Sequence, residues 1–174
     1  IVHVFEVGDH DEIPYFVLDY IEGQTFEALL KTSPPLAESL RVIRDIALAL
    51  DHAHSQGVIH RDVKPQNIMV KPDQQAILMD FGLAKDLGQS GSLPATGQHL
   101  GTPTYMAPEQ IDIKTGAIGP TADIYALGAT LYRAVTGRPP FVADTGLVVI
   151  RKLLMDDPVP LRRLVATVPA DLET

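Results

Sequence analysis

The sequence has no cysteine, no tryptophan and no long apolar run among its 174 residues. Without cysteine the chain can form neither a disulfide framework nor a Cys-ligated zinc site, which fits a reducing compartment. No apolar run approaches the roughly 18 residues that suggest a membrane span, and no signal-peptide pattern opens the chain, so we expect no membrane contact within this segment. Basic residues are also scarce. The 14 Lys and Arg against 22 Asp and Glu give a net charge of −8, which argues against nucleic acid as a partner.

What is present is ordinary for one soluble folded domain, with 45% hydrophobic and 21% charged residues. The length is sufficient for a single hydrophobic core. The sequence begins at Ile1 rather than Met, inside an expected strand. We therefore expect the natural polypeptide to extend upstream.

Hydrophobic periodicity divides the chain into strands and helices. Strands are expected at 1–7 and 14–21, with a polar turn at 8–12 between them. The elements expected after them are a short helix capped by Thr25, a long helix over 36–55 ended by Gly57, an apolar hairpin at 68–70 and 76–79, a helix that opens at Asp123 and stops at 137–141, a helix over 147–155, and loop beyond it. Residues 83–100 are rich in Gly, Ser and Thr and should form a surface loop.

The long helix over 36–55 is expected to be a core helix without chemistry of its own. Its apolar residues recur at helical spacing, and its charged residues fall on other faces. His52 and His54, near its end, are interpreted as surface or capping histidines rather than metal ligands. A metal site built on the six histidines of the chain has little support, because no pair has ligand spacing beside an acidic partner on a common face.

The residues that carry chemistry gather in one octet, His60-Arg61-Asp62-Val63-Lys64-Pro65-Gln66-Asn67, and in the triplet Asp80-Phe81-Gly82. Transfer of a phosphoryl group from Mg-ATP to a hydroxyl needs this set. A carboxylate orients the hydroxyl and takes its proton, which suits Asp62, and a cation steadies the transferred phosphate, which suits Lys64. Metal ions that bridge the phosphates need hard oxygen ligands, which Asn67 and Asp80 supply. The loop and the end of the neighbouring strand should bring these groups together.

Four motifs in order carry a family resemblance. The octet matches H-R-D-x-K-x-x-N and the triplet matches D-F-G. They are followed by Gly101 to Glu109, which matches G-T-x-x-Y-M-A-P-E, and by Asp123 to Gly128 at a helix start. The chain thus resembles a bacterial, eukaryotic-like (Hanks-type) Ser/Thr protein kinase. The resemblance implies an α+β, protein-kinase-like fold with a mainly α-helical C-lobe and a remnant β-hairpin of the N-lobe. Residues 1–22 would be the end of the N-lobe and the hinge, and residues 23–174 a C-lobe truncated before its last helices.

The resemblance also implies a nucleotide site. Leu18 would be the gatekeeper, the Asp19 carbonyl and the Ile21 amide would bind adenine, and Met69 would close the pocket from below. The full set implied to contact ATP is Leu18, Asp19, Ile21, Lys64, Gln66, Asn67, Met69 and Asp80. The implied cofactors are ATP and Mg²⁺, with Mn²⁺ as an alternative.

Control and support are implied at further positions. Arg61 beside Asp62 implies loop control, because a cation there adds electrostatic strain until a phosphate on the activation segment (Asp80 to Glu109) pairs with it. Thr96 is the favoured phosphate acceptor, and Ser90, Ser92 and Thr104 are weaker candidates. Thr102 would hydrogen-bond towards Asp62 and Lys64. Asp123 would tie its helix to the backbone of the octet, and the other structural positions are His60, Phe81, Gly82 and Glu109.

Parts of the family pattern are absent from these residues. The glycine-rich phosphate loop, the strand lysine and its helix glutamate are missing, and so are the late helices with the arginine that pairs with Glu109. We therefore expect Glu109 to be an unpaired buried carboxylate, at a cost of about 3–5 kcal/mol. We also expect these residues alone not to phosphorylate efficiently.

The function implied is that of a Ser/Thr protein kinase, active in the complete polypeptide, because Ser/Thr members of the family carry the lysine found here as Lys64-Pro65. Its partners would be protein substrates with Ser or Thr acceptors and a second kinase copy for autophosphorylation. Its location would be cytoplasmic, with any membrane anchor outside this segment. The alternative is a pseudokinase or docking module. The intact Asp62, Asn67 and Asp80 count against that alternative.

Overall fold

The computed structural model describes residues 1–11, 13–81 and 103–173. Its elements, in chain order, are β1 (Val4–His10), β2 (Ile13–Leu18), β3 (Gln24–Thr25), α1 (Phe26–Leu30), α2 (Leu36–Ser55), the 3₁₀ turn η1 (Pro65–Asn67), β4 (Ile68–Val70), β5 (Ala76–Leu78), η2 (Pro103–Tyr105), α4 (Pro108–Ile111), η3 (Ile113–Thr115), α5 (Pro120–Thr136), α6 (Gly146–Met155), α7 (Leu161–Leu164) and η4 (Ala170–Leu172). The predicted α+β class is confirmed. None of the helices in the described ranges is both long and apolar enough to cross a membrane.

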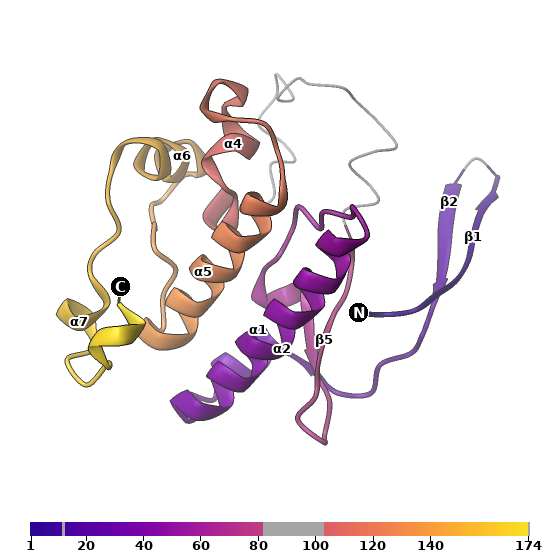
Figure 1. Cartoon of the computed structure of the whole chain (residues 1–174), viewed down its shortest axis with the longest axis horizontal. Helices are drawn as coiled ribbons and strands as arrows, with labels where there is room; N and C mark the ends of the chain where they lie inside the picture. The colour runs from indigo at the N-terminus through magenta and orange to yellow at the C-terminus, as the bar shows by residue number, and fades with distance from the viewer. Residues whose placement is uncertain (12, 82–102, 174) are drawn as a thin grey trace.

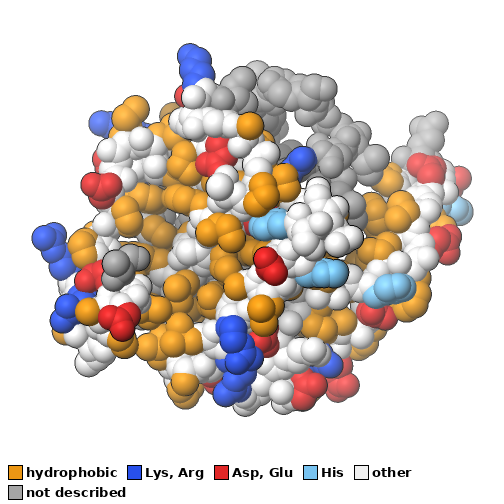
Figure 2. All heavy atoms as spheres, viewed as in Figure 1, with side chains coloured by type: hydrophobic (Ala, Val, Ile, Leu, Met, Phe, Trp, Pro, Cys, Tyr) orange, Lys and Arg blue, Asp and Glu red, His pale blue; other side chains and the backbone are white. Residues whose placement is uncertain are grey.

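Strands β1 and β2 form an antiparallel hairpin that stands apart from the helical body (Figure 1). The predicted bounds were wrong by up to three residues. Residues 8–10 were expected in the turn but belong to β1, because His10 pairs with Ile13 and the chain reverses at Asp11, whose φ is 50°. Apolar side chains on the hairpin are exposed, including Phe5 and Ile13, and Figure 2 shows such side chains at the right of the view. A two-stranded hairpin gains little stability by itself.

A second sheet packs against α1 and α2. Its strand order is β3-β4-β5, and both pairings are antiparallel. The hairpin of β4 and β5 was predicted from its apolar residues. Strand β3 was not, because two residues are too few to show a period. It pairs Gln24 with Val70 and Thr25 with Met69, and Thr25 then caps α1 as predicted, accepting a hydrogen bond from the Ala28 amide.

Helices α2 and α5 lie side by side and supply much of the core (Figure 1). The bounds of α2 agree with the prediction, and Gly57 follows it in the left-handed region at φ 74°. Val42, Ile46 and Leu50 are almost completely buried on its inner face. They share a cluster with Ala126 and Leu127 of α5.

The C-terminal part differs from prediction in two places. Helix α5 begins at Pro120, three residues before the expected Asp123, because proline is well suited to the first helical position, where its missing N–H costs nothing. Residues after 155 were expected to be loop, yet α7 forms there. Leu161 of α7 is buried against Tyr132 and Val168, so tertiary packing stabilises a helix too short to show a pattern.

The contrast between Leu50 and Leu48 tests this core. Leu50 has no exposed surface, whereas Leu48 on the same helix is 63% exposed. Leu50→Ala should lower the free energy of unfolding by about 2–5 kcal/mol, because it leaves a cavity, and Leu48→Ala should change it far less. Urea unfolding of the two variants measures the difference. Equal effects would contradict the placement of α2.

Candidate active site

Asp62 lies at the centre of a small group of polar side chains from the octet. The Nζ atom of Lys64 is 2.7 Å from Asp62 Oδ2. Nδ2 of Asn67 donates to the Asp62 carbonyl at 2.8 Å and to Asp62 Oδ2 at 3.0 Å. The carboxylate is therefore held from two sides by donors of its own loop, with about a third of its side-chain surface exposed. Such a carboxylate is oriented and reachable.

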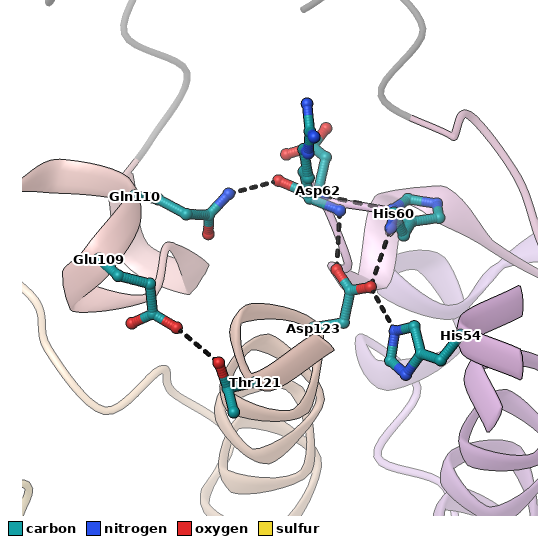
Figure 3. Close-up of polar contacts among 8 residues, drawn as sticks. His54, His60, Asp62, Glu109, Gln110, Thr121 and Asp123 are labelled. Atoms are coloured by element: carbon teal, nitrogen blue, oxygen red, sulfur yellow. Dashed lines mark hydrogen bonds and ion pairs between the residues drawn. The ribbon is translucent and has the colours of Figure 1, made fainter. Parts of the chain in front are cut away.

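The backbone of the loop is fixed from below by Asp123 of α5 (Figure 3). Its Oδ2 accepts from the His60 amide at 2.8 Å, and its Oδ1 accepts from the Arg61 amide at 2.7 Å. Asp123 is completely buried. These are the backbone contacts expected of this residue, and they hold Arg61 in the left-handed region at φ 66°, a conformation that needs external support in a non-glycine residue.

His54, in the last turn of α2, joins the same carboxylate. Its Nε2 lies 2.8 Å from Asp123 Oδ2, and its side chain is 14% exposed. His54 was expected to be a surface or capping residue. That expectation was wrong, because the packing of α2 on α5 brings His54 to a carboxylate 69 residues away. No local pattern signals such a pair.

His60 connects the loop to the segment after β5. Its Nε2 is 2.8 Å from the Met79 carbonyl, and its Nδ1 accepts from the Asp62 amide at 3.2 Å, so the neutral Nε2–H tautomer satisfies both contacts. Its ring lies 4.6 Å from the ring of Phe81. Burial lowers the pKa of His60, while the Met79 carbonyl and the nearby carboxylates act in the opposite direction.

Asp80 lies between Met79 and Phe81, two residues after β5, with its side chain exposed. Its backbone is also left-handed, at φ 55°. The Met79 amide donates to the Asn67 carbonyl at 2.9 Å, so Asp80 is placed next to the residue with which it was expected to share a metal ion. Among the described residues, no three His, Cys, Asp or Glu side chains form a group that could hold a metal by themselves.

The predicted nucleotide contacts lie on separate elements. Leu18 ends β2, and Asp19 follows it with its amide bonded to the His3 carbonyl at 3.1 Å. Met69 is half-buried in β4, and Gln66 is exposed in η1. In the part of the chain that the structure describes, no hydrogen bond joins Leu18, Asp19 or Ile21 to the loop that carries Asp62.

The segment 103–111 contacts the loop through a residue that sequence reasoning missed. Gln110 donates from Nε2 to the Arg61 carbonyl at 2.7 Å (Figure 3). Its Oε1 accepts from the Ala107 amide at 3.0 Å. Thr104, a weaker candidate for phosphorylation, is buried. Gly82, Ser90, Ser92, Thr96 and Thr102 lie outside the described residues.

Glu109 differs from expectation. It was predicted to be an unpaired buried carboxylate, but it is only half-buried and its Oε1 accepts from the Thr121 hydroxyl at 3.2 Å. Helix α4 lies beside the start of α5, which brings the hydroxyl within reach. The predicted energetic penalty therefore does not apply.

A shallow pocket opens beside Asp62, between the loop, η2 and α5. The residues that line it are Arg61, Asp62, Val63, Lys64, Tyr105, Met106, Gln110 and Ala126. It thus combines the candidate base and cation with the segment expected to receive the substrate.

The family model "Protein kinase domain" matches residues 1–165. The chain belongs to the protein kinase family. It is 37% identical over 180 aligned positions to the serine/threonine-protein kinase PknB of Mycolicibacterium smegmatis, with 99% of this chain and 28% of the relative covered. It is 35% identical over 180 positions to PknB of Mycobacterium tuberculosis, with the same coverage. A probable serine/threonine-protein kinase of Streptomyces coelicolor is 36% identical over 165 positions, with 91% and 24% covered.

These relatives confirm the bacterial Hanks-type Ser/Thr kinase group that the motifs indicated. This kinase chain spans about 28% of the length of the PknB relatives that it matches. Members of the family use ATP and a divalent metal ion.

Removal of the buried carboxylate tests how the loop is held. Asp123→Ala leaves two backbone N–H groups and His54 without their acceptor, so the free energy of unfolding should fall by about 2–5 kcal/mol. The matched control is Asp51→Ala, which removes an exposed carboxylate from α2. Chemical denaturation of both variants checks this. A similar small loss in both would contradict the role of Asp123.

The lowered pKa of His60 predicts a pH dependence. The unfolded chain binds more protons than the folded chain below about pH 6.5, so the stability that neutral His60 contributes is present above that pH and is lost as the pH falls towards the folded pKa. The difference in unfolding free energy between the wild type and His60→Phe should therefore shrink between about pH 7.5 and pH 5.5. Parallel pH profiles for the two proteins would contradict it.

Proposed function

We propose that the protein containing this chain transfers the γ-phosphoryl group of ATP to Ser or Thr hydroxyls of proteins. The observation that carries the proposal is the arrangement around Asp62, whose carboxylate is held by Lys64 and Asn67 on a loop fixed to α5 through Asp123. A general base in phosphoryl transfer must be oriented and accessible, and Asp62 meets both requirements.

Asp62 would accept the proton of the attacking hydroxyl and point its oxygen at the phosphorus atom. As the new O–P bond forms, the bond from the γ-phosphorus to the bridging oxygen breaks, and ADP leaves with that electron pair. The Lys64 ammonium steadies both the Asp62 carboxylate and the transferred group, because it is a mobile point charge with three donors.

Asn67 and Asp80 fit the metal that the family uses. Because Nδ2 of Asn67 donates to Asp62, its Oδ1 is the atom left for a cation. Asp80 adds an exposed carboxylate. Mg²⁺ keeps several waters and takes one or two protein oxygens together with phosphates, so two ligands suffice, and Mn²⁺ would accept the same oxygens. When bound, the ion neutralises phosphate charge.

The remaining site residues are proposed on the family pattern. Leu18, Asp19, Ile21, Gln66 and Met69 would contact the nucleotide. Arg61 would respond to phosphorylation of Thr96, and Thr102 would bond towards Asp62 and Lys64. Phe81 packs on His60, and with Gly82 it would shape the turn that presents Asp80. The division into lobes at residue 22 stays a prediction.

The substrates would be proteins with Ser or Thr acceptors, and a second kinase copy would be one of them. The protein would be cytoplasmic, where ATP is available for the reaction. The kinase function is favoured over the pseudokinase alternative because Asp62, Asn67 and Asp80 are all present and the relatives are named as Ser/Thr kinases.

Asp62→Asn in the full-length protein tests the proposal. The amide keeps the shape of the side chain but cannot take a proton, so phosphate transfer to protein should fall by about 10²-fold or more. Transfer is measured with γ-labelled ATP, and nucleotide binding is measured by fluorescence titration. Asp51→Asn, an exposed carboxylate on α2, is the control and should keep wild-type activity. Equal activity of Asp62→Asn and the wild type would refute the role of Asp62.

A further inference from the structure

Gln110 connects α4 to the peptide unit that directly precedes Asp62. Its Nε2 donates to the Arg61 carbonyl at 2.7 Å, across 49 residues of sequence, and Figure 3 shows the side chain extending from α4 towards the octet. On the other side of the same peptide unit, the Asp62 amide donates to His60 Nδ1 at 3.2 Å. The peptide that leads into the candidate base is therefore held at its oxygen and at its nitrogen.

The side-chain amide of Gln110 has one orientation that satisfies both of its partners. Its Oε1 accepts from the Ala107 amide at 3.0 Å. An N–H cannot accept and a carbonyl cannot donate, so the oxygen must face Ala107 and the nitrogen must face Arg61. The Gln110 backbone amide also donates to the Ala107 carbonyl, at 3.0 Å. The donor that reaches the octet is thus itself fixed within α4.

Helix α4 is in turn attached to α5. Glu109 accepts from the Thr121 hydroxyl at 3.2 Å, and α4 packs on both α5 and α6. Helix α5 also carries Asp123, which accepts from the Arg61 amide at 2.7 Å. Both backbone polar groups of Arg61 are therefore held by helices outside the octet, its N–H by α5 and its carbonyl by α4.

This double attachment matters because of the conformation of Arg61. Its φ of 66° is left-handed, and a non-glycine residue keeps such a conformation only where its surroundings hold it. The peptide is planar, so rotation of the unit between Arg61 and Asp62 would change ψ of the first residue and φ of the second together. A changed φ of Asp62 would move its carboxylate relative to Lys64 and Asn67. The hydrogen bond from Gln110 opposes this rotation, which would carry the carbonyl away from Nε2.

We propose that Gln110 is a positioning residue for phosphoryl transfer, which orients Asp62 by fixing the peptide unit between Arg61 and Asp62. The inference rests on the proposed kinase function, in which Asp62 accepts the proton of the hydroxyl. A misdirected base slows the chemical step, because that step requires the reacting groups to be aligned. Loss of the Gln110 donor should therefore lower the rate of transfer and leave the binding of ATP and substrate unchanged.

The test uses two variants of the full-length protein that remove the donor. Gln110→Glu keeps an oxygen for the Ala107 amide but places a carboxylate oxygen against the Arg61 carbonyl, and Gln110→Met has a similar length and replaces both groups. Each should lower the single-turnover rate of transfer from γ-labelled ATP to an acceptor peptide by about 10-fold or more. Gln75→Glu makes the same change at an exposed residue between β4 and β5 and should keep the wild-type rate.

Two further measurements separate positioning from other roles. The KM values for ATP and for the acceptor peptide should stay near those of the wild type. Because Gln110 also lines the pocket beside Asp62, a raised peptide KM with an unchanged transfer rate would show a substrate contact instead and would overturn the inference.

Urea unfolding is the second measurement. Gln110→Glu should be more stable than Gln110→Met, since it keeps the bond to the Ala107 amide, yet both should transfer slowly. If the rates follow the stabilities instead, with Gln110→Glu nearly as fast as the wild type, Gln110 only supports α4 and the inference is wrong.

The wild type distinguishes this inference from the proposed function. If the wild type phosphorylates the peptide and both Gln110 variants do so equally fast, the role of Gln110 is refuted and the kinase function stands. If the wild type phosphorylates neither peptides nor proteins, the proposed function fails and the inference fails with it.

Discussion

The candidate site depends on the hydrogen bonds that the buried carboxylate of Asp123 accepts from the loop of Asp62. A carboxylate without exposed surface is costly unless donors surround it, and Asp123 has two backbone amides and His54 around it. The same donors would be left unpaired if the carboxylate were absent. The carboxylate and its donors therefore require one another, and their hydrogen bonds join α2, α5 and the loop of Asp62. The left-handed backbone of Arg61 is stable only within this arrangement.

Two further sets of contacts connect the loop held by Asp123 to its neighbours. His60 contacts the Met79 carbonyl and the ring of Phe81 beyond β5, and the Met79 amide bonds to the Asn67 carbonyl, which places Asp80 close to Asn67. The Arg61 carbonyl accepts a hydrogen bond from Gln110 of α4. The segments that carry the candidate base, the proposed metal ligands and the candidate substrate surface are thus linked by hydrogen bonds to one carboxylate. These hydrogen bonds are buried or partly buried, so a polar group left there without its partner would be costly.

The sequence predicted what depends on local pattern. Helix α2 was placed by its apolar period and its terminal glycine, and the octet by its chemistry. The sequence did not predict contacts between elements that lie far apart in the chain. His54 and Glu109 were misjudged because their partners, Asp123 and Thr121, become neighbours only when α5 packs against α2 and α4. Strand β3 and helix α7 were missed because elements of two and four residues show no period and are stabilised by their neighbours.

The two segments proposed to contact the nucleotide are held with unequal strength. The loop of Asp62 is attached to a core that includes Val63 and Ile68, both almost completely buried. The hairpin that leads to Asp19 has exposed apolar faces. The backbone hydrogen bond that ties its leading segment to the helical body runs from the Val2 amide to the Leu78 carbonyl, at 3.0 Å. Segments with few buried contacts open at low free energy. We therefore expect the hairpin to open at a lower free energy than the loop that carries Asp62, Lys64 and Asn67.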